Sequence, residues 1–160
     1  MGVSGSGKTT IGKKLSEEID IPFFDGDNFH SEANKEKMRS GHPLTDKDRA
    51  AWLIRINEFA KEQMTRKGAI IGCSALKEKY RKVLSSGITS PLYWIFLKGT
   101  YELIKKRMEE RKGHYMKANM LSSQFEALEV PRHAITIEIS HPPDEIVEQI
   151  ISEIGARSKK

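Results

Sequence analysis

A phosphate-binding pattern opens the chain. Residues 2–9 read GVSGSGKT and fit G-x-x-x-x-G-K-[ST], the Walker A pattern. Glycine backbones can turn successive N–H groups toward one phosphate chain, Lys8 can reach the β- and γ-phosphates, and the Thr9 hydroxyl can ligate Mg²⁺. The apolar spacing over residues 11–19 predicts a helix whose N-terminus faces the same phosphates. These residue types therefore indicate a nucleotide site.

A second motif overlaps this loop. Residues 1–6 also fit M-G-x-x-x-[ST], the pattern for N-myristoylation of Gly2. An acyl group there would occupy the first residue of the phosphate loop, so the two interpretations exclude each other. The longer motif is the better supported.

Two carboxylates follow the apolar run 21–24. Asp25 and Asp27 come where a parallel sheet places its ligand crevice, at the carboxyl end of a strand. Alternation aims one carboxylate toward Mg²⁺ and its waters and the other toward an acceptor hydroxyl. The run Asp-Gly-Asp-Asn is also good turn chemistry, but the nearby Walker A loop favours a site.

Two basic pairs have helical spacing. Lys77 and Arg81 are four residues apart, as are Arg107 and Arg111, so each pair shares a helix face. The first pair could bind an acidic substrate, and the second could stabilise a migrating phosphoryl group from a segment hinged at Gly113. Ordinary solvated helix faces are the alternative for both.

Alternating elements must position these residues. Apolar runs at 21–24, 69–73, 92–97 and 134–139 predict strands, and the second and third are apolar enough to be buried on both faces. Helices are predicted from a capping box at residues 45–48, over residues 101–111, and from Pro143. Strands alternating with helices indicate an α/β fold with a parallel sheet covered on both faces.

Composition narrows the class of protein. The 160 residues suit one domain, and 38% hydrophobic with 31% charged residues argues against disorder. The net charge of +5 favours anionic partners, but the lysines are scattered, so we expect no nucleic-acid partner. Cys73 is the single cysteine, and no apolar stretch is long enough for a membrane span. We expect a cytoplasmic protein without a membrane partner.

Several segments together resemble the gluconokinases, which belong to the small P-loop kinases along with shikimate and nucleoside monophosphate kinases. DGDNFH, GHPLTDKDR, CSALK and GHYM are the most particular of them. The matching segments are GVSGSGKTT (2–10), DGDNFH (25–30), NKEKMRSGHPLTDKDRAAWL (34–53), CSALKEKYR (73–81), FLKG (96–99), RKGHYM (111–116) and LSSQFEALEVP (121–131).

The resemblance implies a fold and a reaction. The reaction is ATP-dependent phosphorylation of D-gluconate at its terminal hydroxyl, a step of carbohydrate metabolism, with ATP and Mg²⁺ as cofactors. The fold is a three-layer sandwich with a central parallel sheet in the order 2-3-1-4-5. A helical lid at about residues 111–128 lies within a single domain, residues 1–160. Homodimers occur in the family.

The resemblance also assigns roles to residues. Lys8, Asp27 and Arg111 would be catalytic, with Asp27 orienting or deprotonating the acceptor hydroxyl. Thr9 and Asp25 would hold the metal, Asp25 through water. The ATP site would comprise Gly2, Val3, Ser4, Gly5, Ser6, Gly7, Lys8, Thr9, Thr10 and Arg107. The acceptor site would comprise Asp27, His30, Arg49, Lys77, Arg81 and His114, with Arg49 pairing with the gluconate carboxylate.

The sequence departs from the family in one respect. A Walker A loop normally follows a buried strand, but only Met1 precedes Gly2. In the order 2-3-1-4-5 this strand is central, so its absence leaves buried backbone groups unpaired at about 1–3 kcal/mol each. We therefore expect that the sequence starts at an internal methionine and that the natural chain has an N-terminal strand. A kinase for a shikimate-like acceptor and a non-catalytic nucleotide-binding protein remain the alternatives.

Overall fold

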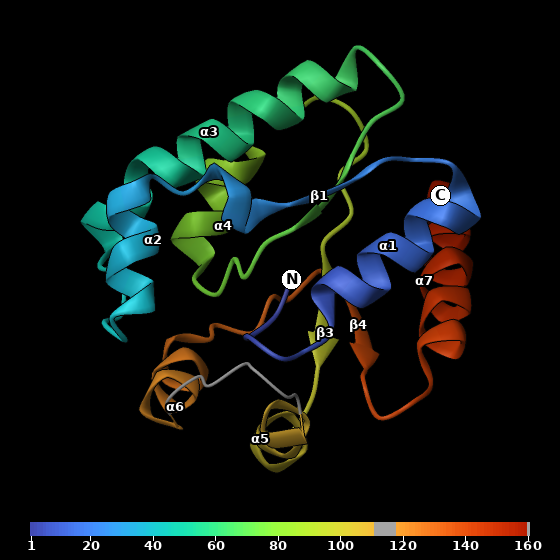
Figure 1. Ribbon diagram of the computed structural model, residues 1–160. Helices are drawn as coiled ribbons and strands as arrows, with labels where there is room; N and C mark the ends of the chain where they lie inside the picture. Colours follow the sequence, from blue (N-terminus) through green and yellow to red (C-terminus); the bar gives the residue numbers. More distant parts are fainter. Residues whose placement is uncertain (111–117, 160) are drawn as a thin grey trace.

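The computed structural model describes residues 1–110 and 118–159, and these alternate between helices and strands (Figure 1). All four predicted strands are present, although β3 begins at Ile95 rather than Leu92. The elements are α1 (Lys8–Ile19), β1 (Phe23–Asp25), the 3-10 helix η1 (Gly26–Phe29), α2 (Glu32–Arg39), α3 (Asp46–Met64), β2 (Ile70–Gly72), α4 (Glu78–Ser85), β3 (Ile95–Lys98), α5 (Tyr101–Glu110), α6 (Ala118–Ala127), β4 (Ile135–Glu138) and α7 (Pro143–Ser158).

The predicted capping box begins α3. The Thr45 hydroxyl accepts from the Asp48 N–H at 3.2 Å, and the Asp48 carboxylate accepts from the Thr45 N–H at 2.7 Å. These bonds satisfy donors that a helix start leaves free. The cap thus fixes the start of α3, which carries Arg49 one turn further on.

The four strands form two parallel pairs. β1 pairs with β2, with Phe23 opposite Ile70, and β3 pairs with β4, with Ile95 opposite Ile135. Within the described residues, no ladder joins the two pairs. They correspond to strands 2-3 and 4-5 of the expected order. Parallel pairing is confirmed, and the sheet is divided at the position of strand 1.

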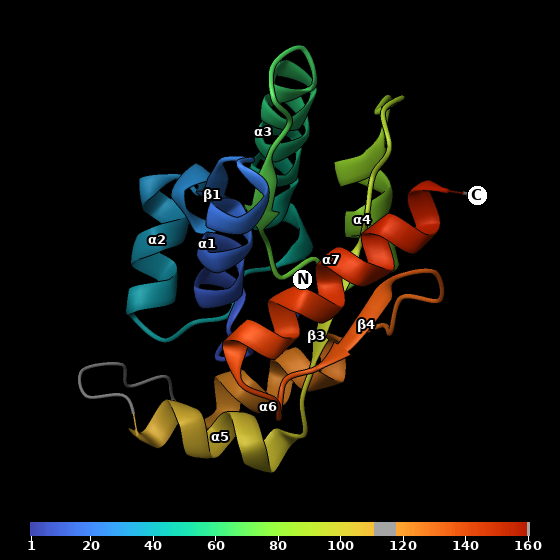
Figure 2. The same ribbon diagram turned by 90° about the vertical axis from the view of Figure 1, so that its right-hand side faces the viewer.

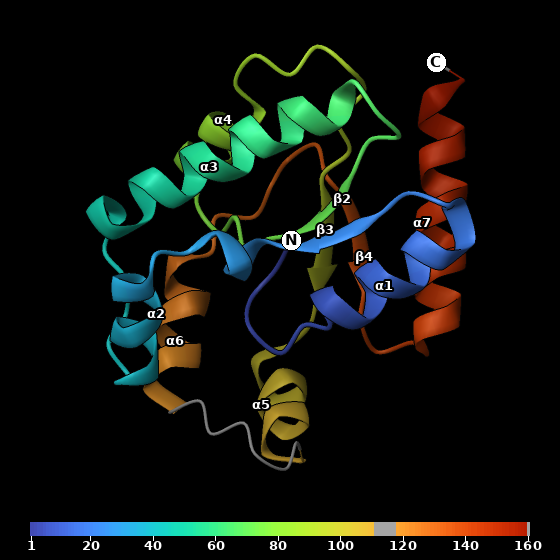
Figure 3. The same cartoon turned by 45° about the horizontal axis from the view of Figure 1, so that its top comes forward.

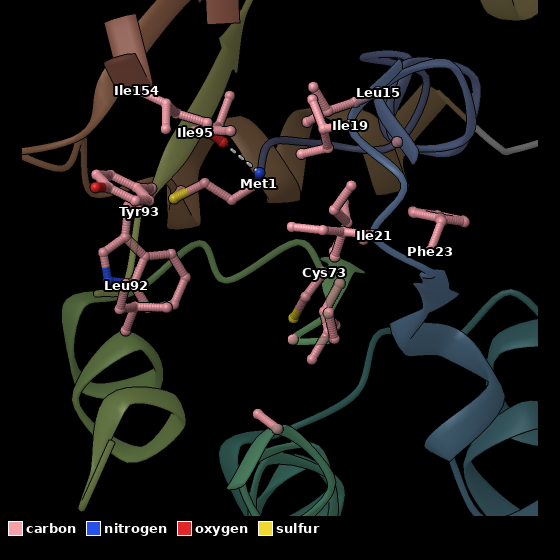
Figure 4. A pocket seen from close by; sticks show the side chains of 18 of the residues that line it. Met1, Leu15, Ile19, Ile21, Phe23, Cys73, Leu92, Tyr93, Ile95 and Ile154 are labelled. Carbon is pink, nitrogen blue, oxygen red and sulfur yellow. Dashed lines mark hydrogen bonds between the residues drawn. The ribbon is translucent and has the colours of Figure 1, made fainter. Parts of the chain in front are cut away.

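An apolar cavity of about 530 Å³ lies between the two pairs. Figure 4 shows side chains from both pairs and from α1 and α7 around it, with Met1 among them. The Met1 amino group donates to the Ile95 carbonyl, and the Leu97 N–H donates to the Met1 carbonyl at 3.0 Å. The Gly2 N–H donates to the Ser74 carbonyl at 3.2 Å, beyond the end of β2. Met1 therefore lies beside β3 in the manner of a parallel strand.

Helices cover the strands on two sides. α1 packs against α7 on one side, and α3 packs against α4 on the other (Figures 1 and 2). The first pair buries Ile11, Leu15 and Ile150, and the second buries Trp52 and Leu84. This is the three-layer α/β arrangement expected from the sequence.

α5 and α6 lie together near the phosphate loop (Figure 3). The Tyr101 and Phe125 rings meet edge to face with centroids 5.5 Å apart. Residues 111–117, the first part of the expected lid, lie outside the described residues. In the part of the chain that is described, no helix has the length and apolar character to cross a membrane.

Candidate active site

The phosphate loop runs from Gly2 to Gly7 and leads directly into α1. Gly7 caps this helix with φ of 93°, a left-handed conformation that favours glycine. Gly2 has φ of 143°, and a Cβ there would lie 2.9 Å from the Leu97 carbonyl oxygen. The side chains of Val3 and Ser6 are buried. The loop can therefore offer its backbone N–H groups, rather than these two side chains, to an anion at the start of α1.

Lys8 folds back over this loop. Its Nζ donates to the carbonyl oxygens of Gly2 at 3.0 Å and Val3 at 2.9 Å. Burial lowers the pKa of Lys8, and the charge of Asp27 partly opposes this shift. Among the described residues, the hydrogen-bond acceptors of this partly buried ammonium group are neutral carbonyls, so it can turn to phosphate oxygens without breaking an ion pair.

The end of β1 brings carboxylates to the start of α1. The Thr9 hydroxyl donates to Asp25 Oδ2 at 3.2 Å, and Asp25 Oδ1 accepts from the Asp27 N–H at 3.0 Å. Asp27 stays exposed to solvent, but desolvation by the surrounding protein and the neighbouring Asp25 charge raise its pKa, and Lys8 opposes the shift. Asp27 is consequently a stronger base than an ordinary aspartate.

A second cavity, of about 370 Å³, lies between the start of α3, the loop after β2, and α6; we call it the basic cavity. Arg49 and Lys77 bring positive charge to it, and Gln124 and Ser123 are its polar residues on α6. Its lining comprises Met38, Pro43, Leu44, Thr45, Asp46, Arg49, Leu76, Lys77, Tyr80, Met120, Ser123, Gln124 and Ala127.

Cations surround the Tyr80 ring at one wall of the basic cavity. The charged groups of Arg49, Lys77 and Lys79 lie 5.7, 5.6 and 5.9 Å from the ring centroid. Asp46 accepts hydrogen bonds from the Tyr80 hydroxyl and both lysines, including Lys77 at 3.1 Å, and these bonds hold its pKa well below the ordinary value. Three cations and one carboxylate leave a positive excess, which suits an anionic ligand.

His30 lies against α3 as a neutral ring. It stacks on Trp52 with centroids 4.3 Å apart and approaches the Asn34 side chain at 3.4 Å. Burial, followed by the charges of Arg49 and Lys35, lowers the pKa of His30 to about 4. His30 is outside the lining of the basic cavity, so the structure does not bring it together with Arg49 and Lys77 there.

The other predicted basic residues are placed differently. Arg81 is buried and donates to the carbonyls of Ala75 at 2.9 Å and Leu76 at 3.0 Å, so it supports the loop after β2 and lies outside the cavity lining. Lys77 is the N-cap residue before α4 and does not share a helix face with Arg81. Arg107 donates to the Ile139 carbonyl at 2.6 Å. Arg111 and His114 lie outside the described residues.

Sequence reasoning missed two residues of the basic cavity. Asp46 directly follows the N-cap of α3, so the sequence indicates only a role in the capping of this helix. In the structure its carboxylate accepts hydrogen bonds from Tyr80, Lys77 and Lys79. Gln124 carries no charge and lies in a helical segment, yet its Oε1 accepts from the Ser4 N–H of the phosphate loop at 2.6 Å. The only sequence signal for either residue was its place inside a segment of the family resemblance.

A phosphate loop, a basic aspartate and a cationic cavity now lie within one three-layer α/β fold. This combination defines a P-loop kinase that acts on a small anionic acceptor.

Comparisons with known proteins identify the family within this class. The shikimate kinase family model matches residues 4–155. The chain is 45% identical to a probable gluconokinase of Dictyostelium discoideum, over 95% of this chain and 82% of that one. It is 41% identical to the thermoresistant gluconokinase of Escherichia coli, over 96% and 90%. The crystal structure of a gluconokinase from Sinorhizobium meliloti superposes with a TM-score of 0.91 and 36% identity, covering 99% and 91%. The chain belongs to the gluconokinase family.

Proposed function

We propose that this chain transfers the γ-phosphoryl group of ATP to the terminal hydroxyl of D-gluconate, giving 6-phospho-D-gluconate and ADP. The observation that carries the proposal is the basic cavity, because it joins the phosphate loop through Gln124 and carries Arg49 and Lys77. A sugar acid presents a carboxylate for the cations and a chain of hydroxyls that extends toward the loop.

The phosphate loop and Lys8 would bind the triphosphate. The N–H groups of Gly2, Ser4 and Ser6 already donate to protein acceptors. The other backbone N–H groups of the loop and the positive end of α1 favour the negative charge of the triphosphate. On ATP binding, the Lys8 ammonium would exchange the carbonyls of Gly2 and Val3 for the β- and γ-phosphate oxygens. Lys8 would then stabilise charge on the migrating phosphoryl group.

The residues present fit Mg²⁺. Thr9 and Asp25 offer hard oxygen ligands 3.2 Å apart beside the phosphate loop. Within the described residues, no group of three or more His, Cys, Asp or Glu could hold a metal, which suits an ion bound chiefly by phosphates and water. Thr9 would ligate the ion and Asp25 would hold one of its waters. The ion would neutralise phosphate charge.

Asp27 would act on the acceptor. Its carboxylate takes the proton of the terminal hydroxyl as that oxygen forms its bond to the γ-phosphorus, while the bond to the β–γ bridging oxygen breaks and ADP leaves. The raised pKa of Asp27 strengthens it as a base. Arg49 and Lys77 would hold the gluconate carboxylate at the opposite end, Arg49 through a two-pronged guanidinium contact.

Further assignments from the resemblance complete the proposal. Arg107 would serve the nucleotide, Arg111 the migrating phosphoryl group and His114 the acceptor. His30 and Arg81 lie outside the lining of the basic cavity, so they would serve the acceptor side through the elements they support, α3 and the loop after β2. Residues 1–160 would form a single kinase domain with its lid at about residues 111–128. We also propose a cytoplasmic location. We further propose a homodimer, and sedimentation of the purified chain would test this oligomeric state.

A coupled assay of ADP release tests the substrate. The chain, ATP and Mg²⁺ are incubated with D-gluconate, its epimers or shikimate, and ATP affinity is measured separately by calorimetry. We expect kcat/KM for D-gluconate to exceed that for shikimate by at least about 100-fold, because shikimate lacks a matching chain of hydroxyls. Equal rates would overturn the assignment of the substrate. ATP binding without turnover of any acceptor would favour a non-catalytic nucleotide-binding protein.

A further inference from the structure

Gln124 connects the two parts of the proposed site. It lies on α6, 120 residues from Ser4, and its Oε1 accepts from the Ser4 N–H at 2.6 Å. The same side chain lines the basic cavity beside Ser123. One neutral side chain therefore contacts the phosphate loop and faces the space proposed for the acceptor.

The hydrogen bond from Ser4 identifies the oxygen and the nitrogen of the Gln124 side-chain amide. Ser4 N–H is a donor, so the atom facing it must be the Gln124 carbonyl oxygen, and the Nε2 group takes the other position. Among the described residues, Nε2 has no hydrogen-bond partner. Two N–H donors are thus held in a fixed orientation and are free for a ligand.

The rest of the cavity limits what that ligand group is. Arg49 and Lys77 supply the cations for a carboxylate. The Ser123 hydroxyl already donates to the Met120 carbonyl at 2.9 Å, and Met120 and Ala127 contribute apolar surface on the same helix. A neutral donor next to the phosphate loop fits a hydroxyl oxygen better than a second anion.

We propose that Gln124 binds a hydroxyl of the acceptor through Nε2 while its Oε1 stays bonded to Ser4, and that it thereby selects polyol acids. The proposal rests on the proposed function. Because the anchor is the phosphate loop itself, the bond holds the hydroxyl chain in a fixed position relative to the γ-phosphate. An acceptor lacking that hydroxyl leaves the N–H group unpaired and binds less well.

The test compares the full chain with two variants. Gln124→Met keeps the length of the side chain and removes both polar atoms. Glu126→Gln, at an exposed position of the same helix outside the cavity lining, is the matched control. For each, kcat and KM are measured with D-gluconate and with a series of gluconates lacking one hydroxyl each. Melting temperatures and the affinity for an ATP analogue are measured in parallel.

We expect Gln124→Met to raise the KM for D-gluconate about 3- to 10-fold, the effect of one neutral hydrogen bond. The unchanged chain should discriminate against one deoxy-gluconate by a similar factor, and Gln124→Met should lose that discrimination. Glu126→Gln should behave like the unchanged chain. If Gln124→Met discriminates among the deoxy-gluconates as the unchanged chain does, the proposal is overturned.

A second variant covers the case in which Gln124→Met fails to fold. Gln124→Glu keeps an oxygen for the Ser4 N–H but has no N–H to donate, so it should keep the melting temperature and lose the same discrimination. Discrimination retained by Gln124→Glu would contradict the proposal. Absence of gluconate turnover in the unchanged chain would instead sink the proposed function, so the two failures are distinguishable.

Discussion

At the scale of single residues, the site combines groups whose surroundings shift their chemistry. Desolvation lowers the pKa of Lys8, and desolvation and the nearby charge of Asp25 raise the pKa of Asp27. Each of the two charges opposes the other's pKa shift, so the proposed phosphate binding by Lys8 and the proposed proton removal by Asp27 would be coupled. The charges of Arg49 and Lys35 contribute to keeping His30 neutral.

Replacing Asp27 tests its proposed role as the base. Asp27→Asn should lower kcat by about 10²–10⁴-fold, the usual contribution of a positioned base. It should not lower the melting temperature, because a carboxylate with a raised pKa is disfavoured in the folded state at neutral pH. In the unchanged chain, activity should fall on acidification with a midpoint above the ordinary aspartate value. Asp144→Asn, at an exposed ion pair with Lys14, is the control, and full activity in Asp27→Asn would contradict the role.

His30 should make stability sensitive to acid. Its pKa is about 4 in the folded chain, against an ordinary 6.5. As the pH falls below about 6.5, the unfolded chain gains a proton that the folded chain refuses until about pH 4, so the free energy of unfolding decreases over this interval. Melting curves between pH 7 and 4.5 should show a smaller decrease for His30→Gln than for the exposed control His133→Gln. Equal decreases would disprove the assignment.

At the scale of elements, the Walker A loop, the capped start of α3 and the parallel pairing follow from local sequence. The capping box depends only on Thr45 and Asp48, which are three residues apart. The glycines of the loop have positive φ angles, which glycine adopts readily. The bond between Ser4 and Gln124 joins residues far apart in the chain, so no local pattern carries it. The contacts of Arg81 could not be predicted either. Helical spacing places residues on one face of a helix, but it does not show whether that face meets solvent, a ligand or the carbonyls of a neighbouring loop.

The space between β2 and β3 leads to a prediction about the sheet. Met1 already bonds to β3, and its amino group is buried, which lowers its pKa to about 5. Joining a short apolar, β-branched segment to this amino group should fill the cavity shown in Figure 4 and pair with both strand edges.

Melting curves measure the effect of that segment. Several added backbone hydrogen bonds at about 0.5–1.5 kcal/mol each should raise the melting temperature by about 5–10 °C. A glycine–serine segment of the same length also removes the buried amino group, so it is the matched control. Equal melting temperatures for the two segments would show that the cavity does not accept a strand.

At the scale of the whole molecule, the fold brings four separate segments to one site. In the proposed site, the loop before α1 would supply phosphate-binding groups, the end of β1 Asp27, the start of α3 Arg49, and α6 Gln124. Of the basic residues, Arg49 and Lys77 line the basic cavity and Lys8 lies at the phosphate loop. An anionic partner was predictable from composition, but the fold was needed to show that the phosphate loop and the basic cavity lie at separate places joined by Gln124.

The reaction that we propose is transfer of phosphate from ATP to the terminal hydroxyl of gluconate. Phosphorus and carbon NMR of a reaction with ATP, Mg²⁺ and D-gluconate measures this directly. We predict one phosphate ester, on the terminal carbon, formed in step with ADP by the unchanged chain and strongly reduced in Asp27→Asn. Release of inorganic phosphate without an ester, or an ester at another position, would contradict the account.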